Sequence, residues 1–250
     1  MTEIADKWFN GENLGYHGLV TPDVSGIFDV PDLEVARSWT DGCDIPNDVT
    51  IRHGLPTIQF TDAVVAEDTH EELVRKLALL AGLIAPDLGF CTFEIENRPG
   101  QRTWARSKGL PVRIDVLPYI ARSVIFTLAF ERWSWWEDAY PITLTDPTSI
   151  NNTGQMSAYP TYTMTVTNTL SSGLSLTVGS RTWQYTGALT ATDVLVLATD
   201  PQAPDITLNG TRDFANADSD DRLTLAVGKN TVTKSSADYT LDVSYRRRYF

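Results

Sequence analysis

The amino-acid sequence predicts a mainly β protein in two parts, a strand-rich part with one packed α-helix and then a β-sandwich of jelly-roll type. One segment has helical periodicity, and about eight short alternating segments follow residue 150. The composition also changes, because residues 1–142 contain ten threonines and residues 143–250 contain twenty-one. We therefore expect domains at 1–145 and 146–250, joined by a linker at 143–154, where turn-forming residues dominate.

The helix is expected at residues 69–85. Thr69 and Glu72 have the spacing of a capping box, and Pro86 ends the segment. The apolar residues at helical spacing are Leu73, Leu77, Leu80 and Ile84. One amphipathic helix among strands predicts that this apolar side packs against a sheet or barrel.

The rest of the first part is expected to be strands and loops. Strands are predicted at 30–38, 57–64, 91–95, 112–117 and 122–133, with a long polar loop at 39–54. After the strand at 91–95, Gly100 suits the left-handed position of a three-residue hairpin loop. That register places Glu96 opposite Arg102, Glu94 opposite Trp104, and Thr92 opposite Arg106. This charged face could be solvated or lie at a subunit contact, so Arg102, Trp104 and Arg106 are candidate contact residues.

In the second part, the expected strands are 161–167, 174–178, 182–186, 193–198, 205–208, 222–227, 230–234 and 239–247. Tyr162, Met164 and Val166 alternate with threonines, which is typical of a half-buried strand. Asn209-Gly210 is a type I′ hairpin signal.

Charge and cysteine content narrow the function classes. The formal net charge of −12 argues against a protein that grips nucleic acid by neutralising phosphates, and residues 1–150 hold 23 of the 32 acidic residues. No apolar run has bilayer-spanning length and no signal peptide is visible, so we expect no membrane insertion. Cys43 and Cys91 form no disulfide framework, and two reduced thiols in a cytosolic product are expected.

No residue pattern predicts an enzyme, a cofactor or a metal site. His70-Glu71-Glu72 lacks the second histidine of a zinc motif, and Asp218-Ser-Asp220-Asp221 lacks the glycine and distal glutamate of a calcium loop. The nucleophile-elbow, phosphate-loop and dinucleotide motifs do not occur. Among so many acidic residues a glycosidase-like carboxylate pair stays open.

Two aromatic groups and one basic run have alternative interpretations. Trp133, Trp135, Trp136 and Tyr140 could pack between domains or stack on sugars, and Trp135 and Trp136 are candidate contacts. Trp183 and Tyr185 are expected in the core, with sugar stacking as the alternative. Arg246-Arg247-Arg248 could pair with an acidic partner or with the acidic first domain, or it could be a solvated chain end.

The order of short motifs resembles the distal tail protein family of siphophages, the long-tailed, non-contractile bacteriophages. The motifs are Asn152-Thr-Gly154, Pro160-Thr-Tyr-Thr-Met-Thr-Val166, Ile206-Thr-Leu-Asn-Gly210 and Arg222-Leu-Thr-Leu-Ala-Val-Gly-Lys-Asn230. In that family an asparagine-glycine opening, a strand ending in asparagine-glycine and a leucine-glycine-asparagine turn mark a galectin-like domain. The opening departs here, because Thr-Gly-Gln stands where the family has x-Gly-Asn. The similarity covers both parts and is strongest at 150–232.

The resemblance implies a tail-tube-like ring-forming domain followed by a galectin-like β-sandwich. It implies a homo-oligomer, a hexameric ring, that joins the tail tube protein to the tail-tip hub protein and contacts the end of the tape-measure protein. Receptor-binding proteins would attach to it, and DNA would only pass through its lumen. It implies a structural virion component at the tail tip, assembled in the host bacterial cytoplasm. The alternative is a lectin-like protein that binds carbohydrate through the second domain.

Overall fold

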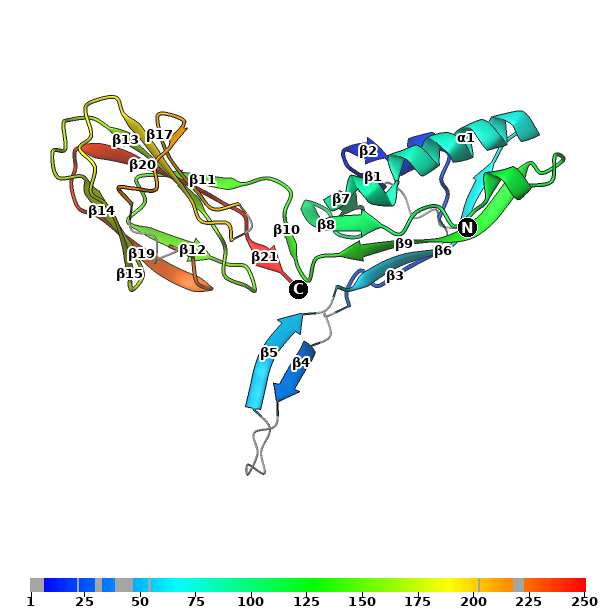
Figure 1. Ribbon diagram of the computed structural model, residues 1–250, viewed down its shortest axis with the longest axis horizontal. Coiled ribbons are helices and arrows are strands. Elements are labelled where there is room, and N and C mark those ends of the chain that lie inside the picture. The colour runs from blue at the N-terminus through cyan, green and yellow to red at the C-terminus, as the bar shows by residue number, and fades with distance from the viewer. Residues whose placement is uncertain are drawn as a thin grey trace. The chain divides into compact units, whose positions relative to one another are not determined.

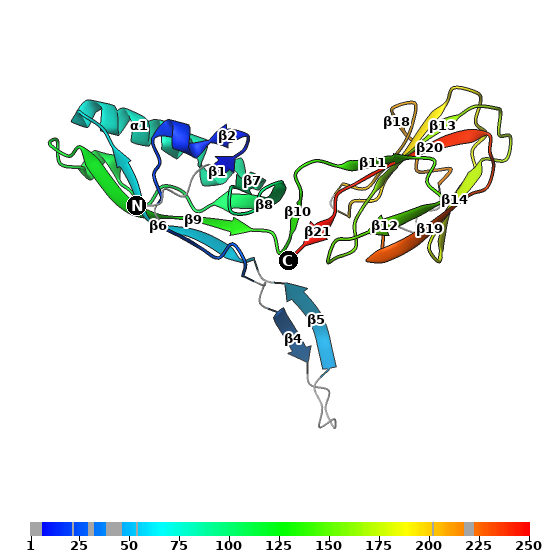
Figure 2. The same cartoon turned by 180° about the vertical axis from the view of Figure 1, so that it is seen from behind.

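A computed structural model describes residues 7–21, 23–29, 33–38, 47–53, 55–201, 203–217 and 223–250 (Figure 1 and, from behind, Figure 2). The chain divides into two compact units, Met1–Trp136 with Phe250, and Glu137–Tyr249. The division falls nine residues before the boundary expected at 145/146. The roles assigned to domains 1–145 and 146–250 stay predictions.

An antiparallel sheet forms the body of the first unit. Its strands follow the order β2-β1-β7-β8-β9-β6-β3. Their bounds are β1 Lys7–Phe9, β2 Glu12–Asn13, β3 Asp23–Ser25, β6 Thr57–Ala66, β7 Cys91–Ile95, β8 Gln101–Ser107 and β9 Ser123–Arg132. A separate pair, β4 (Leu33–Ser38) and β5 (Asn47–His53), forms its own two-stranded sheet. Short 3-10 helices, η1 (Leu14–His17), η2 (Pro86–Leu88) and η3 (Ile114–Val116), lie in the connections.

Among the described residues there is one α-helix, α1 (His70–Leu83), which confirms the helix expected at residues 69–85. The Thr69 hydroxyl accepts a hydrogen bond from the Glu72 backbone N–H at 3.2 Å and donates one to the Glu72 carboxylate at 3.1 Å. The predicted apolar side, Leu73, Leu77, Leu80 and Ile84, is fully buried. It contributes to a core that contains tilted and edge-on contacts among Phe9, Phe60, Phe93 and Phe130, with ring centroids 5.1–6.2 Å apart.

Three expectations for the first unit were wrong. The hairpin loop is longer than three residues, because Arg98 N–H donates to the Ile95 carbonyl and Gln101 N–H donates to the Arg98 carbonyl. The register therefore pairs Glu94 with Arg102 and Thr92 with Trp104. The expected strand at 112–117 contains η3 instead. The expected loop at 39–54 contains β5, while residues 39–46 and 54 lie outside the described part of the chain.

The second unit is a β-sandwich. One sheet has the order β11-β20-β13-β16-β17-β18 and the other β12-β19-β14-β15. The first sheet consists of β11 Ile142–Thr145, β13 Thr161–Val166, β16 Val194–Ala198, β17 Asp205–Leu208, β18 Thr211–Arg212 and β20 Tyr239–Tyr245. The second consists of β12 Ser149–Asn152, β14 Leu174–Val178, β15 Arg181–Tyr185 and β19 Gly228–Lys234. Two short strands, β10 (Trp136–Asp138) and β21 (Arg248–Tyr249), pair with each other, and β10 also pairs with β8 of the nine-stranded sheet.

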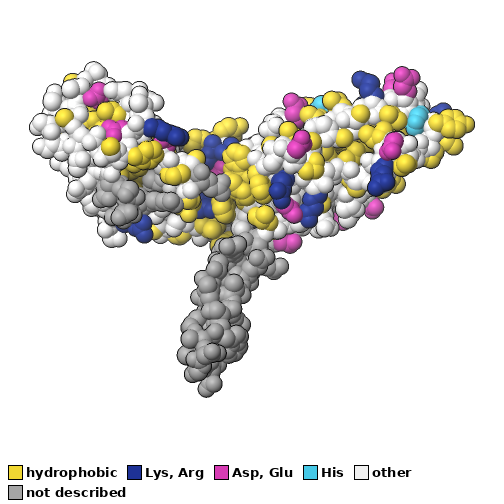
Figure 3. Space-filling view, viewed as in Figure 1, with side chains coloured by type: hydrophobic (Ala, Val, Ile, Leu, Met, Phe, Trp, Pro, Cys, Tyr) yellow, Lys and Arg dark blue, Asp and Glu magenta, His cyan; other side chains and the backbone are white. Residues whose placement is uncertain are grey.

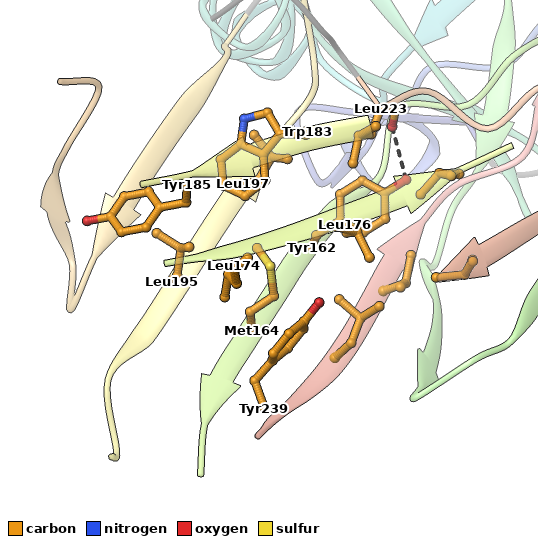
Figure 4. Close-up of a cluster of buried hydrophobic side chains, with 14 of the residues drawn as sticks. Tyr162, Met164, Leu174, Leu176, Trp183, Tyr185, Leu195, Leu197, Leu223 and Tyr239 are labelled. Atoms are coloured by element: carbon orange, nitrogen blue, oxygen red, sulfur yellow. Dashed lines mark hydrogen bonds between the residues drawn. The ribbon is translucent and has the colours of Figure 1, made fainter. Parts of the chain in front are cut away.

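The core of the sandwich lies between these two sheets (Figure 4). Tyr162 and Met164 point inward from β13, and the Tyr162 hydroxyl donates to the Leu223 carbonyl at 3.0 Å. Trp183 and Tyr185 are each 1% exposed, as the core interpretation expected. Neither ring therefore offers the open face that sugar stacking would require.

Two expectations for the second unit were also wrong. The segment 143–154 is no linker, because it contains most of β11 and all of β12. The segment 223–227 is not a ladder strand, although Leu223 and Leu225 are buried in alternation. Its backbone makes a single isolated bridge, between Leu225 and Ala158.

The asparagines of the short motifs hold corners of this sandwich. The buried Asn152 amide donates to the carbonyls of Met156 and Leu225 at 3.0 and 3.2 Å, and its oxygen accepts the Gly154 N–H at 3.0 Å. A Cβ on Gly154 would lie 2.9 Å from the Arg248 backbone, so the corner requires glycine.

Asn230 forms a similar set of hydrogen bonds with the turn that leads into β19. Its side chain accepts from Ala226 N–H at 3.0 Å and donates to the Ala226 and Gly228 carbonyls at 2.8 and 3.0 Å. Gly228 has φ +90°, which is a left-handed conformation that favours glycine. The leucine-glycine-asparagine motif is therefore explained by turn geometry.

Candidate subunit or partner interface

The candidate contact residues of β8 lie on the sheet face opposite the buried core. Along β8, Thr103, Ala105 and Ser107 are buried, while Arg102, Trp104 and Arg106 alternate with them and are half-buried or exposed. This follows from the two-residue period of a strand, since the inward residues fill the core. The sequence therefore places the three candidates together on the outer face.

Trp104 belongs to a cluster of rings on this outer face. The Trp133 ring centroid lies 5.4 Å from that of Trp104, 5.1 Å from that of Trp135 and 6.3 Å from that of Phe90. All four rings are half-buried. We call Phe90, Arg102, Trp104, Arg106, Trp133 and Trp135 the aromatic face.

Arginines cover two rings of the aromatic face. Arg102 Cζ lies 5.8 Å from the Trp104 centroid, and Arg106 Cζ lies 5.3 Å from that of Phe90. Arg106 Nη2 also donates to Glu131 Oε2 at 2.7 Å, and this hydrogen bond is the main cause that lowers the pKa of Glu131. Lys108 lies 3.5 Å from the same carboxylate.

This composition suits recognition of another protein. Tryptophan and arginine dominate the binding energy of protein interfaces, because they combine large apolar area with directional or cationic contacts. The aromatic face has both residue types in preformed contacts, so its side chains lose little freedom on binding.

Trp136 does not belong to the aromatic face, which corrects its selection beside Trp135. It is fully buried, and its indole N–H donates to the Ile27 carbonyl at 3.1 Å. The guanidinium carbons of Arg98 and Arg132 lie 4.9 and 5.6 Å from its ring. Arg132 is fully buried, and its burial lowers its pKa to about 10.

Two residues of the aromatic face were missed as candidates. Trp133, for which packing between domains and sugar stacking were the alternatives, contacts both Trp104 and Trp135. Phe90 directly precedes β7 and lies outside the alternating residues 91–95. Aromatic residues directly before β7 and directly after β9 are the signal that indicates both.

The described part of the chain contains none of the metal-binding groups considered in the sequence. No group of three histidine, cysteine or acidic side chains there is placed to hold a metal ion. The His70 ring nitrogen Nδ1 instead lies 2.9 Å from the Ala121 carbonyl oxygen, at the start of α1. Cys91 is a buried free thiol whose pKa is raised by burial. Cys43 and Asp218-Ser-Asp220-Asp221 lie outside the described residues.

The basic run Arg246-Arg247-Arg248 makes contacts within the chain, and its pairing with Asp138 agrees with the interpretation that it meets the acidic residues of the domain expected at 1–145. Arg247 forms an ion pair with Asp138 at 2.8 Å, and Tyr249 donates its hydroxyl to the same carboxylate at 3.2 Å. Arg246 donates to the carbonyls of Asp138 and Ala139, and Arg248 donates to that of Ser157.

Comparisons with known proteins were made for the sequence and for the fold. A family model described as "Siphovirus-type tail component, C-terminal domain" matches residues 153–249. Among solved structures, the chain is similar to the Dit (gp 19.1) protein of phage SPP1, with a TM-score of 0.75 and 14% identity. That alignment covers 98% of this chain and 99% of the SPP1 chain.

Two chains from the phage p2 baseplate in its activated conformation are more distant. The strontium form gives a TM-score of 0.49 and the calcium form 0.48, each at 9% identity. They cover 94% and 96% of this chain, and 93% of each baseplate chain. No curated protein matches the sequence.

Residues 153–249 therefore resemble the C-terminal domain of siphovirus-type tail components. Across both units, the chain has the fold of the SPP1 Dit protein, and the resemblance to siphophage distal tail proteins is confirmed. The family match covers residues 153–249, and the likeness of fold to the SPP1 Dit protein covers both units. Within the described residues, none of the helices has the length and apolar character that crossing a membrane needs.

Proposed function

We propose that this protein is a distal tail protein that forms a hexameric ring in the tail tip of a siphophage. The observation that carries the proposal is the Dit fold over 98% of the chain, together with the tail-component match over residues 153–249. The ring joins the tail tube protein to the tail-tip hub protein. It also contacts the end of the tape-measure protein, and its role is structural.

The first unit is proposed to build the ring. Its sheet is open, with β2 and β3 at the two ends of the strand order among the described strands. Strand edges carry unpaired backbone N–H and C=O groups, which a neighbouring subunit can satisfy. Repeated head-to-tail contacts close into a ring when the rotation between subunits permits.

The aromatic face is proposed as a contact surface of this assembly. Its rings and guanidinium groups are already in contact within one subunit, which lowers the entropy cost of docking. This assigns Arg102, Trp104, Arg106 and Trp135 to subunit or partner contacts.

The excess of acidic residues in the first unit suits a lumen through which DNA passes. Negative charge around the lumen repels phosphates, so DNA slides without binding. The galectin-like second unit is proposed as the platform for receptor-binding proteins. We place assembly in the host cytoplasm and the finished ring in the virion.

Immunogold labelling of purified virions tests this assignment. Antibodies raised against the purified chain should label one end of the tail, opposite the capsid, after mild disruption of attached receptor-binding proteins. A tail-tube protein would instead be labelled along the whole tail. Absence of the chain from virions, by labelling and by mass spectrometry, would contradict the proposal.

A further inference from the structure

The loop between β8 and β9 presents exposed apolar side chains at one end of the first unit. Val116, Tyr119 and Ile120 are 67%, 83% and 71% exposed, and Ile125, near the start of β9, is 66% exposed. We call these four residues the apolar tip. In Figure 3, hydrophobic surface gathers at the right-hand end of the unit that contains α1, where Figure 1 shows this loop.

The apolar tip is held in place by hydrogen bonds to α1 and its approach. The Ala121 carbonyl lies 2.9 Å from His70 Nδ1, and the Arg122 carbonyl accepts the Glu67 N–H at 2.8 Å. Within the loop, Ala121 N–H donates to the Pro118 carbonyl at 2.8 Å. The loop is therefore a fixed projection, so little entropy is lost when it is covered.

Apolar character continues from the tip onto the sheet. Ile125 pairs directly with Val64 of β6, and Val64 is bridged to Val20 on its other side. Directly paired residues of antiparallel strands point to the same face. Val20 is 43% exposed, so the outward side of this sheet end is apolar across three neighbouring segments.

The area of this surface is sufficient for a subunit contact. Four large side chains that are two-thirds or more exposed amount to a few hundred Å², which is the size at which patches on monomers mark interaction sites. A standard interface covers about 800 Å² on each partner, of which a little over half is apolar. The tip with its neighbours on the sheet supplies most of that apolar part.

The charge of the loop between β8 and β9 indicates which partner the apolar tip binds. Residues 109–122 contain two basic residues and one acidic residue, whereas the rest of residues 1–136 contains ten basic and nineteen acidic residues. Lys108, which precedes this segment, pairs with Glu131. The tip is thus a basic, apolar projection on an acidic body. A second copy of this chain offers an acidic surface that attracts it, and contact between unlike surfaces is what closes a ring.

We propose that the apolar tip, Val116, Tyr119, Ile120 and Ile125, docks onto the acidic first unit of a second copy and holds the ring together. The proposal rests on the proposed function, because it assigns a contact within that ring. Arg113 and Arg122 orient the docking through charge, and the apolar side chains provide the buried area.

Native mass spectrometry of the full chain tests the proposal with a double variant, Tyr119→Ser with Ile120→Ser. Both side chains are exposed, so folding stability should change little. The wild type should assemble, and the variant should need at least tenfold higher concentration to do so. The matched control is Phe214→Ser with Val227→Ser, which removes exposed apolar side chains from the second unit and should assemble like the wild type.

Hydroxyl-radical footprinting of the wild type gives an independent readout. Oxidation of Tyr119 should fall severalfold on assembly, while that of Phe214 should not change. If the tip variant assembles like the wild type, or Tyr119 stays fully reactive in the oligomer, the tip contacts no second copy and the inference is overturned, while the ring survives. If the wild type never assembles, the proposed ring itself fails and this inference with it.

Discussion

Replacing Asn152 by alanine tests whether the buried asparagine holds the first corner of the sandwich. Asn152 is fully buried and makes three hydrogen bonds, two as donor and one as acceptor. Its neighbour Asn151 is exposed on the opposite side of β12. Asn151→Ala is therefore a matched control, with the same chemical change one residue away.

The expected cost follows from the groups left behind. The Gly154 N–H loses its acceptor, which costs about 1–3 kcal/mol when the group stays buried. The carbonyl of Leu225 also accepts the Ala158 N–H at 2.9 Å, so it is not left unpaired. The two lost donations add about 0.5–1.5 kcal/mol each, so we expect a total of about 2–6 kcal/mol. Asn151→Ala should stay within about 0.5 kcal/mol.

Hydrogen exchange followed by mass spectrometry measures this change in the full chain, unit by unit. Amides of β13 and β20 should exchange roughly 100-fold faster in Asn152→Ala, since 1.4 kcal/mol corresponds to a factor of ten. Amides of α1, in the other unit, should not change and serve as an internal reference. Equal exchange in Asn152→Ala and Asn151→Ala would refute the structural role of this asparagine.

Three further results are expected. Leu77→Asp buries an unpaired carboxylate at a cost of several kcal/mol, so soluble yield and oligomer size should both fall. The control Glu71→Ala should change both quantities little. Normal assembly of Leu77→Asp would refute the packing of this helix face. Burial raises the pKa of Tyr185 and Tyr239 to about 12. Because phenols ionise near pH 10 in the unfolded chain, the free energy of unfolding of the second unit should fall between about pH 10 and 12. Hydrogen exchange or circular dichroism can follow this fall. A free energy of unfolding that does not change over this pH range would contradict the raised pKa values. Trp104→Ala should weaken assembly at least tenfold in sedimentation experiments, and undiminished assembly would remove the aromatic face from the interface.

The regular elements were predictable where periodicity and local chemistry agreed. The strands at 174–178 and 205–208 have the predicted bounds, because alternating residues there fill one core. The capping box and the apolar repeat placed α1 within two residues at each end. Asn209 and Gly210 both have positive φ, as a type I′ turn requires.

The failures have physical causes that one sequence does not contain. The pairing of Glu94 with Arg102 depends on two successive turns between β7 and β8. A glycine at position 100 indicates a turn, but it does not indicate that there are two. The apolar alternation at 112–117 also fits a 3-10 turn with one side exposed, and no partner strand is present to select a strand.

The candidate interface was partly predictable from the alternation of residues along a strand. Arg102, Trp104 and Arg106 share a face because they alternate within one strand. Trp135 and Trp136 are adjacent, so only one of them can lie on that face, and the sequence does not say which. Within the apolar tip, Val116 was assigned to the strand expected at 112–117, and Tyr119 and Ile120 lie between two expected strands, where no periodicity indicates which side chains are exposed.

The mass of the purified full chain in solution tests the central claim, that this protein is a ring-forming tail component. The account predicts, by native mass spectrometry, a dominant species of six copies of the 27.7 kDa chain. Electron microscopy of the same sample should show closed rings with a central opening. Monomers alone at high concentration, both with and without neighbouring tail proteins, would contradict the account.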